Sequence, residues 1–136
     1  MLQKTPRLCL VVEDEPLLAL DIETMLTEAG YLVAGPYASW REALQSVATH
    51  RPDAAIVDFL VQDGNSTELL RALDEALIPF AIYSGRDQAS APEFADAIWL
   101  EKPCMPEKLK SVMRALLEGR ARGYQPGAKV GAPAAC

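Results

Sequence analysis

Short apolar runs alternate five times with longer amphipathic stretches along this chain. The runs occupy residues 8–12, 31–34, 54–58, 79–83 and 97–100. Unbroken apolar runs of this length are typical of strands buried on both faces of a parallel sheet. Because short strand–helix–strand units form right-handed crossovers, the pattern predicts a doubly wound α/β sheet with helices on both faces. The strand order that places the first and third strands side by side is 2-1-3-4-5.

The amphipathic stretches carry recognisable helix start and stop signals. Pro16 suits a first helical turn, and Gly30 is a typical residue at a helix end. Residues 39–42 form a capping-box sequence, and Pro106 marks the start of the last helix. The residues expected to face the core recur at helical spacing: Leu18, Ile22, Met25, Leu26 and Ala29; Trp40, Ala43, Leu44 and Val47; Leu69, Leu70, Leu73 and Leu77; Leu109, Val112, Met113 and Leu116.

Residues 86–96 are a weak candidate for the remaining helix. Phe94 is the only large apolar residue in the segment, so no stripe exists to anchor two turns. Pro92 disfavours helical geometry at the preceding residue and removes a backbone donor. We therefore expect a fourth helix that is short or poorly ordered, with low local stability.

Composition and charge limit the classes of protein to which this chain could belong. The 136 residues suit one folded domain, expected over residues 1–118, with a disordered Gly- and Pro-rich tail over residues 119–136. No apolar run approaches the ~20 residues of a membrane span, and no signal peptide is recognisable, so a cytoplasmic protein is expected. Residues 1–118 hold ten basic against nineteen acidic side chains, which argues against nucleic-acid binding. The three cysteines lack metal-ligand spacing and are expected to be free thiols.

Polar residues that could take part in catalysis or binding stand at the ends of four of the five runs. Glu13 and Asp14 follow the first, Asp58 ends the third, Ser84 follows the fourth and Lys102 follows the fifth. The carboxyl ends of parallel strands share one edge, where open α/β sheets place their ligands. Carboxylates that lie close together favour a bound cation, and oxygen ligands suit Mg²⁺ joined to a phosphate.

The same residues suit phosphoryl transfer. Asp58 would be the nucleophile that forms an aspartyl phosphate. Lys102 and Mg²⁺ would offset charge on the phosphoryl oxygens, and the Ser84 hydroxyl would donate to one of them. Taken singly, each residue has a plainer interpretation, as a solvated helix start, a turn residue or a surface lysine. Their order and spacing together favour the functional interpretation.

That order resembles the response-regulator receiver domain of bacterial two-component signalling, over residues 7–118. The matching positions are the acidic pair Glu13-Asp14, the acceptor Asp58, the hydroxyl of Ser84 and the Lys102-Pro103 pair. The resemblance implies a flavodoxin-like (βα)5 sandwich. It also implies that a sensor histidine kinase or a histidine phosphotransfer protein supplies the phosphoryl group. The expected protein is a stand-alone receiver, a monomer or weak dimer, which acts on an unidentified protein partner or passes the phosphate onward.

The resemblance implies further roles at named positions. Mg²⁺ would be bound by Asp14, Asp58 and the backbone carbonyl of Leu60, with Glu13 acting mainly through water. A switch would draw Ser84 toward the phosphate while an aromatic residue of the fifth strand, here Trp99, rotates inward. Trp99 is bulkier than the Tyr or Phe usual there, so simple core packing is the alternative. The Lys102-Pro103 peptide bond is expected to be cis.

The sequence also departs from the family pattern. The loop over residues 59–65 is short and lacks the common proline, and the usual Gly-Ala before the fifth strand is missing. Leu60 and Arg86 occupy the two positions that tune phosphate hydrolysis in the family. Because Leu60 offers no group to orient water, we expect slow autodephosphorylation and no turnover of small substrates.

Three other functions compete with this interpretation. An Asp-nucleophile phosphatase or phosphotransferase of haloacid-dehalogenase type would need an Asp-x-Asp loop and a cap domain. A flavodoxin-like cofactor binder would need a Ser-, Thr- or Gly-rich phosphate loop after the first strand, where this chain has acids. A histidine phosphotransfer module would have to use His50, the only histidine, which lies at a predicted helix end.

Overall fold

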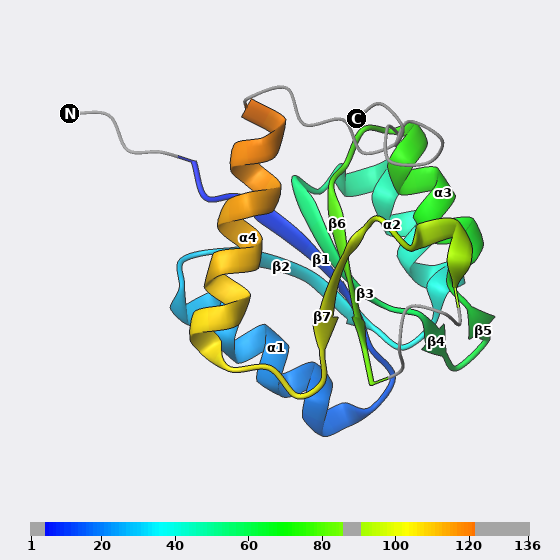
Figure 1. The fold of residues 1–136 in the computed structure, drawn as a ribbon, viewed down its shortest axis with the longest axis horizontal. Helices are drawn as coiled ribbons and strands as arrows, with labels where there is room; N and C mark the ends of the chain where they lie inside the picture. Colours follow the sequence, from blue (N-terminus) through cyan, green and yellow to red (C-terminus); the bar gives the residue numbers. More distant parts are fainter. Residues whose placement is uncertain (1–4, 86–90, 122–136) are drawn as a thin grey trace.

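The computed structural model describes residues 5–85 and 91–121, with side chains placed up to Gly119 (Figure 1). A five-stranded parallel sheet forms its centre, in the order β2-β1-β3-β6-β7. The strands are β1 (Leu8–Val12), β2 (Leu32–Tyr37), β3 (Ala54–Asp58), β6 (Phe80–Ser84) and β7 (Ile98–Glu101). The helices are α1 (Pro16–Glu28), α2 (Trp40–His50), α3 (Thr67–Glu75) and α4 (Pro106–Ala121). The predicted doubly wound fold and strand order are confirmed.

Helices cover both faces of the sheet. α1 and α4 lie on one face, and α2 and α3 lie on the other (Figure 1). The central strand β3 shows why its run is apolar throughout. Ala54 and Ile56 pack toward α1 and α4, whereas Ala55 and Val57 pack toward α2 and α3. Each fully buried side chain of Ile or Leu size contributes about 1.5–3 kcal/mol to folding.

The strand registers align the carboxyl ends of the central strands. Val12 of β1 pairs with Val57 of β3, and Asp58 pairs with Tyr83 of β6. Parallel pairing therefore brings the residues that follow β1, β3 and β6 to one edge of the sheet. This edge carries the candidate site.

The second strand is longer than predicted. It was expected to close at Gly35, but β2 continues to Tyr37 through an irregularity in its pairing with β1. Gly35 has a φ of +102°, and a Cβ there would lie 2.8 Å from the carbonyl oxygen of Val11. Glycine thus lets the strand bend at this point without ending. The Gly35-Pro36 peptide bond is cis, as is the predicted cis bond at Lys102-Pro103.

The prediction that Leu77 faces the core is wrong. Helix α3 ends at Glu75, and Leu77 has a left-handed backbone with φ of 59° and a side chain that is 62% exposed. Ile78 is buried instead, and its N–H donates to the carbonyl of Leu73 at 2.9 Å. The left-handed residue breaks the helical spacing, so the apolar contact moves one position along the chain.

The short segments also differ in detail from the sequence pattern. Residues 59–65 were expected to be a loop, but β4 (Leu60–Val61) and β5 (Gly64–Asn65) form a small antiparallel hairpin. In the described part of residues 86–96, the single helical element is one 3₁₀ turn, η2 (Pro92–Phe94). Residues 86–90 lie outside the described residues. The short fourth helix is confirmed, and Phe94 is buried beside Phe80 as its anchor.

The last helix reaches beyond the expected domain boundary. α4 continues to Ala121, and it therefore includes Gly119. The rest of the predicted tail, residues 122–136, lies outside the described residues. Within residues 5–85 and 91–121, no helix combines the length and apolar character that crossing a bilayer requires.

Candidate functional site

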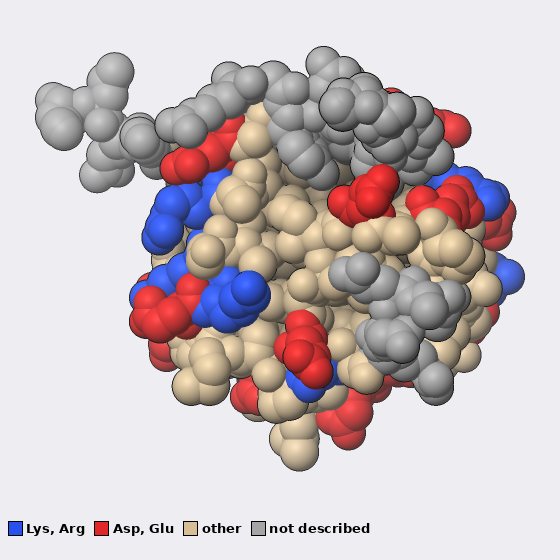
Figure 2. All heavy atoms as spheres, viewed as in Figure 1, with Lys and Arg blue, Asp and Glu red and all other residues tan. Residues whose placement is uncertain are grey.

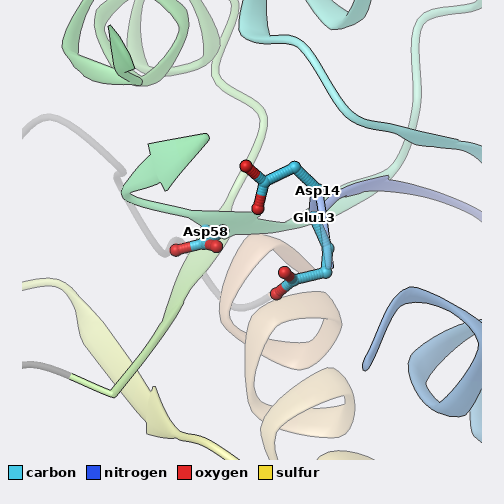
Figure 3. Close-up of side chains that lie close together, drawn as sticks. All are labelled: Glu13, Asp14 and Asp58. Atoms are coloured by element: carbon cyan, nitrogen blue, oxygen red, sulfur yellow. The ribbon is translucent and has the colours of Figure 1, made fainter. Parts of the chain in front are cut away.

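Three carboxylates meet at the edge where β1 and β3 end. Oxygen atoms of Glu13, Asp14 and Asp58 all lie within 4.8 Å of one another. Glu13 and Asp58 are buried, and Asp14 is exposed. Figure 3 shows the carboxylates of Glu13 and Asp14 turning toward the side on which Asp58 lies. The cluster therefore has a closed inner part and an open outer side.

Lys102 enters this cluster from the end of β7. Its Nζ lies 2.7 Å from Glu13 Oε1 and 2.7 Å from Asp58 Oδ2. The backbone N–H of Lys102 donates to the carbonyl of Ser84 at 3.2 Å, which fixes the start of the lysine side chain against β6. One lysine charge faces three carboxylates, so the cluster keeps a net negative charge when all groups are ionised.

The burial and charge of the cluster shift the titration of its members. Burial, with a smaller contribution from the Glu13 carboxylate, raises the pKa of Asp58 to about 6, although the hydrogen bond from Lys102 opposes both effects. Burial also opposes the charge on Lys102, but the hydrogen bonds to Asp58 and Glu13 outweigh it and raise the lysine pKa. An additional cation would offset the repulsion between Glu13 and Asp58.

The donor set suits a divalent cation such as Mg²⁺. Hard carboxylate oxygens converge from two strand ends, and Asp14 leaves one side accessible. Glu13 Oε1 is buried, and the contact with Lys102 Nζ at 2.7 Å occupies only one of its two lone pairs. A buried carboxylate oxygen with spare acceptor capacity is consistent with a further cationic or water ligand.

The three acidic residues that follow β1, Glu13, Asp14 and Glu15, have different roles. Glu15 caps α1, since its Oε1 accepts from the N–H groups of Leu17 at 2.9 Å and Leu18 at 3.4 Å. Glu13 Oε2 accepts from the N–H of Glu15 at 2.9 Å, which orients the buried carboxylate. The plain interpretation of a helix start is therefore correct for Glu15, and Glu13 and Asp14 remain for the site.

Asp58 is positioned by the segment that follows it. The N–H of Leu60 donates to Asp58 Oδ1 at 3.3 Å, and the hydroxyl of Ser66 donates to the Asp58 carbonyl at 2.8 Å. Ser66 is fully buried and was missed at the sequence level. It directly precedes α3, but its hydroxyl makes no cap bond to that helix and is directed to Asp58.

Tyr83 is a second residue that sequence reasoning missed. It pairs with Asp58 in the sheet, and its ring lies 5.3 Å from Lys102 Nζ. This is within the range of a cation–π contact, so Tyr83 supports the lysine from the α1 and α4 face. The sequence feature that could have identified Tyr83 is its position directly before Ser84, at the end of β6.

The two predicted switch residues, Ser84 and Trp99, lie in different parts of the structure. Ser84 is buried at the end of β6 and contacts Lys102 through its backbone. Trp99 of β7 is partly buried, and its indole N–H donates to the carbonyl of Phe94 in η2 at 2.9 Å. Arg86 lies outside the described residues, and His50 is exposed at the end of α2. The structure thus brings Glu13, Asp14, Asp58 and Lys102 together. The hydrogen bond of Trp99 is formed with η2, outside this cluster.

Comparison with known proteins identifies the same class. The model of the response regulator receiver domain family matches residues 9–114. The transcriptional regulatory protein PdtaR of Mycobacterium tuberculosis is 31% identical over 103 residues, which cover 72% of this chain and 50% of that protein. The phyllosphere-induced regulator PhyR of Methylorubrum extorquens is 29% identical over 76% of this chain and 41% of its own length. The chain spans about half the length of the curated relatives it matches, or less.

Solved structures agree with this assignment. A response regulator receiver protein from Sinorhizobium medicae is 29% identical, with a TM-score of 0.74 over 85% of this chain and 97% of its own. A CheY-like receiver domain protein from Methanospirillum hungatei has a TM-score of 0.79 over 88% of this chain and 99% of its own. At 21% identity, the second supports the fold alone.

Proposed function

Because the chain belongs to the response regulator receiver domain family, we propose that Asp58 accepts a phosphoryl group and thereby switches a protein-binding surface. The observation that carries this proposal is the placement of Asp58. It ends the central strand β3, bonded to Lys102 and grouped with two further carboxylates. The donor would be a phosphohistidine of a sensor kinase or of a histidine phosphotransfer protein.

The transfer itself is an in-line displacement. A carboxylate oxygen of Asp58 attacks phosphorus, so that a P–O bond forms while the P–N bond to the donor histidine breaks. The imidazole nitrogen leaves with the electron pair of that bond and takes up a proton. Lys102, which already contacts Asp58 Oδ2 at 2.7 Å, would offset the charge on the phosphoryl oxygens.

Mg²⁺ is the proposed cofactor of this reaction. Asp14, Asp58 and the carbonyl of Leu60 would bind it, with Glu13 acting mainly through water. The ion would supply charge neutralisation for the carboxylates and the incoming phosphoryl group. Because burial raises the pKa of Asp58, a bound cation would help to keep the proposed nucleophile ionised.

The proposed output begins at Ser84 and ends at η2. The Ser84 hydroxyl would donate to the phosphoryl group, and Trp99 would respond on the neighbouring strand β7. Because the indole of Trp99 is bonded to the carbonyl of Phe94, a change at β7 would reach η2 directly. A partner would bind this altered surface, or the phosphate would pass onward to a second histidine.

The charge pattern suits a protein partner. On the face shown in Figure 2, basic side chains stand beside acidic ones, and the centre carries neither. The excess of acids over bases in residues 1–118 disfavours binding to nucleic acid. We propose a cytoplasmic monomer or weak dimer.

Slow loss of the phosphate is part of the proposal. Leu60 lies beside Asp58, and its aliphatic side chain is 43% exposed. It offers no hydrogen bond to an attacking water, so hydrolysis of the aspartyl phosphate would be slow. The alternative, an Asp-nucleophile phosphatase, would instead turn over a small phosphate ester many times.

Labelling with a small acyl phosphate, with and without Mg²⁺, tests the proposed function. Intact mass should show a single phosphoryl adduct that requires Mg²⁺ and disappears in Asp58→Asn. Asp14→Ala should weaken Mg²⁺ binding more than Glu13→Ala, because Asp14 is the proposed direct ligand. Full labelling of Asp58→Asn would contradict the assignment, and multiple turnover of a small substrate would favour the phosphatase.

A further inference from the structure

The β4–β5 hairpin is hydrogen-bonded to Asp58 at its base. The N–H of Ser66 donates to the carbonyl of Phe59 at 2.8 Å, and the Ser66 hydroxyl donates to the carbonyl of Asp58 at 2.8 Å. The N–H of Leu60, the first residue of β4, donates to the Asp58 carboxylate at 3.3 Å. A displacement of the hairpin would therefore change the position of Leu60 relative to Asp58.

The tip of the hairpin is bound to the start of α2 through Asp63. Asp63 Oδ1 accepts from the N–H of Trp40 at 2.9 Å. Asp63 Oδ2 accepts from the Ser39 hydroxyl at 2.8 Å, from the N–H of Arg41 at 3.3 Å and from Arg41 Nη1 at 3.1 Å. One carboxylate thus binds three consecutive residues of another element.

Helix α2 has an N-terminal cap of its own besides the contacts with Asp63. Ser39 Oγ already accepts from the N–H groups of Arg41 at 3.2 Å and Glu42 at 3.3 Å. This is the ordinary capping arrangement. The additional bonds that Asp63 accepts also connect the tip of the hairpin to the start of α2.

The segment between β2 and α2 also contacts the other half of the carboxylate cluster. The carbonyl of Tyr37 accepts from the N–H of Glu13 at 2.9 Å, and the carbonyl of Ala38 accepts from the N–H of Gln62 at 3.2 Å. Adjacent carbonyls thus bind the backbone that carries Glu13 and the hairpin that follows Asp58. The two halves of the cluster are connected through residues 37–41 as well as through the sheet.

We propose that Asp63 is a positioning residue of the Mg²⁺ site. By binding the start of α2, it holds the hairpin, and with it Leu60 and Asp58, at a set separation from Glu13 and Asp14. This inference rests on the proposed function, because the site it adjusts is the Mg²⁺ site of the phosphoacceptor. Hydrogen bonds to Trp40 and Ser39 outweigh the effect of burial and lower the Asp63 pKa to about 2, so the bonds persist at neutral pH.

The test compares Asp63→Ala with Ser39→Ala as the matched control. Ser39→Ala removes the serine cap of α2 and the 2.8 Å bond from the Ser39 hydroxyl to Asp63 Oδ2, but leaves the bonds that Asp63 accepts from Trp40 and Arg41. Titration with Mg²⁺ alone, followed through backbone amide shifts at Asp14 and Asp58, gives the Kd. We expect a Kd at least fivefold weaker in Asp63→Ala and within twofold of the parent protein in Ser39→Ala.

Acyl phosphate labelling gives a second readout. The Mg²⁺ concentration for half-maximal labelling should rise in Asp63→Ala, whereas the rate at saturating Mg²⁺ should stay within twofold. Asp63→Asn retains one acceptor oxygen and should lie between the parent and Asp63→Ala. If Asp63→Ala does not fold, the comparison of Asp63→Asn with Ser39→Ala decides the question.

The Mg²⁺ affinities of the variants separate the positioning role from the proposed function. Equal Kd values for the parent and both Asp63 variants, or equal weakening in Ser39→Ala, would overturn the positioning role while leaving the proposed function intact. Failure of the parent protein itself to bind Mg²⁺ and accept phosphate would overturn the proposed function, and the positioning role with it.

Discussion

Asp58 combines two demands that oppose each other at the scale of a single residue. As the end of a buried strand it is removed from water, and as the proposed nucleophile it would have to be ionised. Burial raises its pKa to about 6, and the contact with Lys102 limits the rise. Besides its proposed role in the transfer step, Lys102 therefore pairs two buried carboxylates in the resting protein.

The raised pKa of Asp58 predicts a pH-dependent stability of the metal-free protein. The folded pKa of about 6 lies above the ordinary value of 3.8, so the folded state binds more protons between these values. Stability from this group therefore falls as pH rises through that window. Asp58→Asn should stabilise the metal-free protein at pH 7 by about 1–2 kcal/mol, after allowance for solvent screening, and should give no gain at pH 4.

Urea unfolding of the parent and Asp58→Asn at both pH values checks this expectation. Asp53→Asn is a useful comparison, because Asp53 accepts from the N–H of Leu8 at the opposite end of the sheet. A lower stability of Asp58→Asn than of the parent at pH 7 would show that Asp58 is not destabilised in the resting protein.

At the scale of elements, two polar contacts connect η2 to β7 and α3, in addition to the buried contact of Phe94 with Phe80. Trp99 donates to the carbonyl of Phe94, and Arg71 of α3 binds Glu93 through two contacts of 2.9 Å. The Arg71–Glu93 pair is exposed, and such pairs contribute about 0–1 kcal/mol. The indole bond is less exposed to competing water, so Trp99 is expected to dominate the local stability of η2.

Trp99→Phe should therefore increase amide exchange in η2 more than Glu93→Gln does. The amides of Ala95 and Ala97, which donate to the carbonyls of Pro92 and Phe94, report the effect. Phosphorylation of the parent protein should change the exchange of the same amides if Ser84 and Trp99 transmit the signal. Identical protection in the two variants, before and after phosphorylation, would argue against this route.

At the scale of the whole molecule, the carboxylate cluster joins the ends of β1, β3 and β7. A cation bound there would stabilise the folded chain by mass action, because the unfolded chain separates these residues. At tenfold its Kd, Mg²⁺ should add about 1.4 kcal/mol to the free energy of unfolding. Thermal unfolding should shift upward by several degrees.

A thermal scan with and without Mg²⁺ measures this shift. In Asp14→Ala the shift should be much smaller, whereas Glu23→Ala, on α1, should keep it. An equal shift in all three proteins would show that Mg²⁺ acts outside the cluster.

The sequence by itself determined the parts that depend on apolar pattern and local signals. Unbroken runs identified all five strands of the sheet, and the short crossovers predicted that these strands are parallel. The predicted order was the one that places the first and third strands side by side. The site residues were predicted because each follows a strand, and parallel pairing brings strand ends to one edge. Ser39 and Pro106 marked true helix starts, because caps and first-turn prolines act through their own backbone.

Tertiary structure alone decided the features that depend on distant partners. Leu77 has helical spacing in the sequence, but the backbone at the end of α3 directs it to solvent. The role of Ser66 depends on the carbonyl of Asp58, and that of Asp63 depends on the start of α2. Such contacts cannot be predicted from local sequence, because they form between groups that come together only when the sheet and the helices pack.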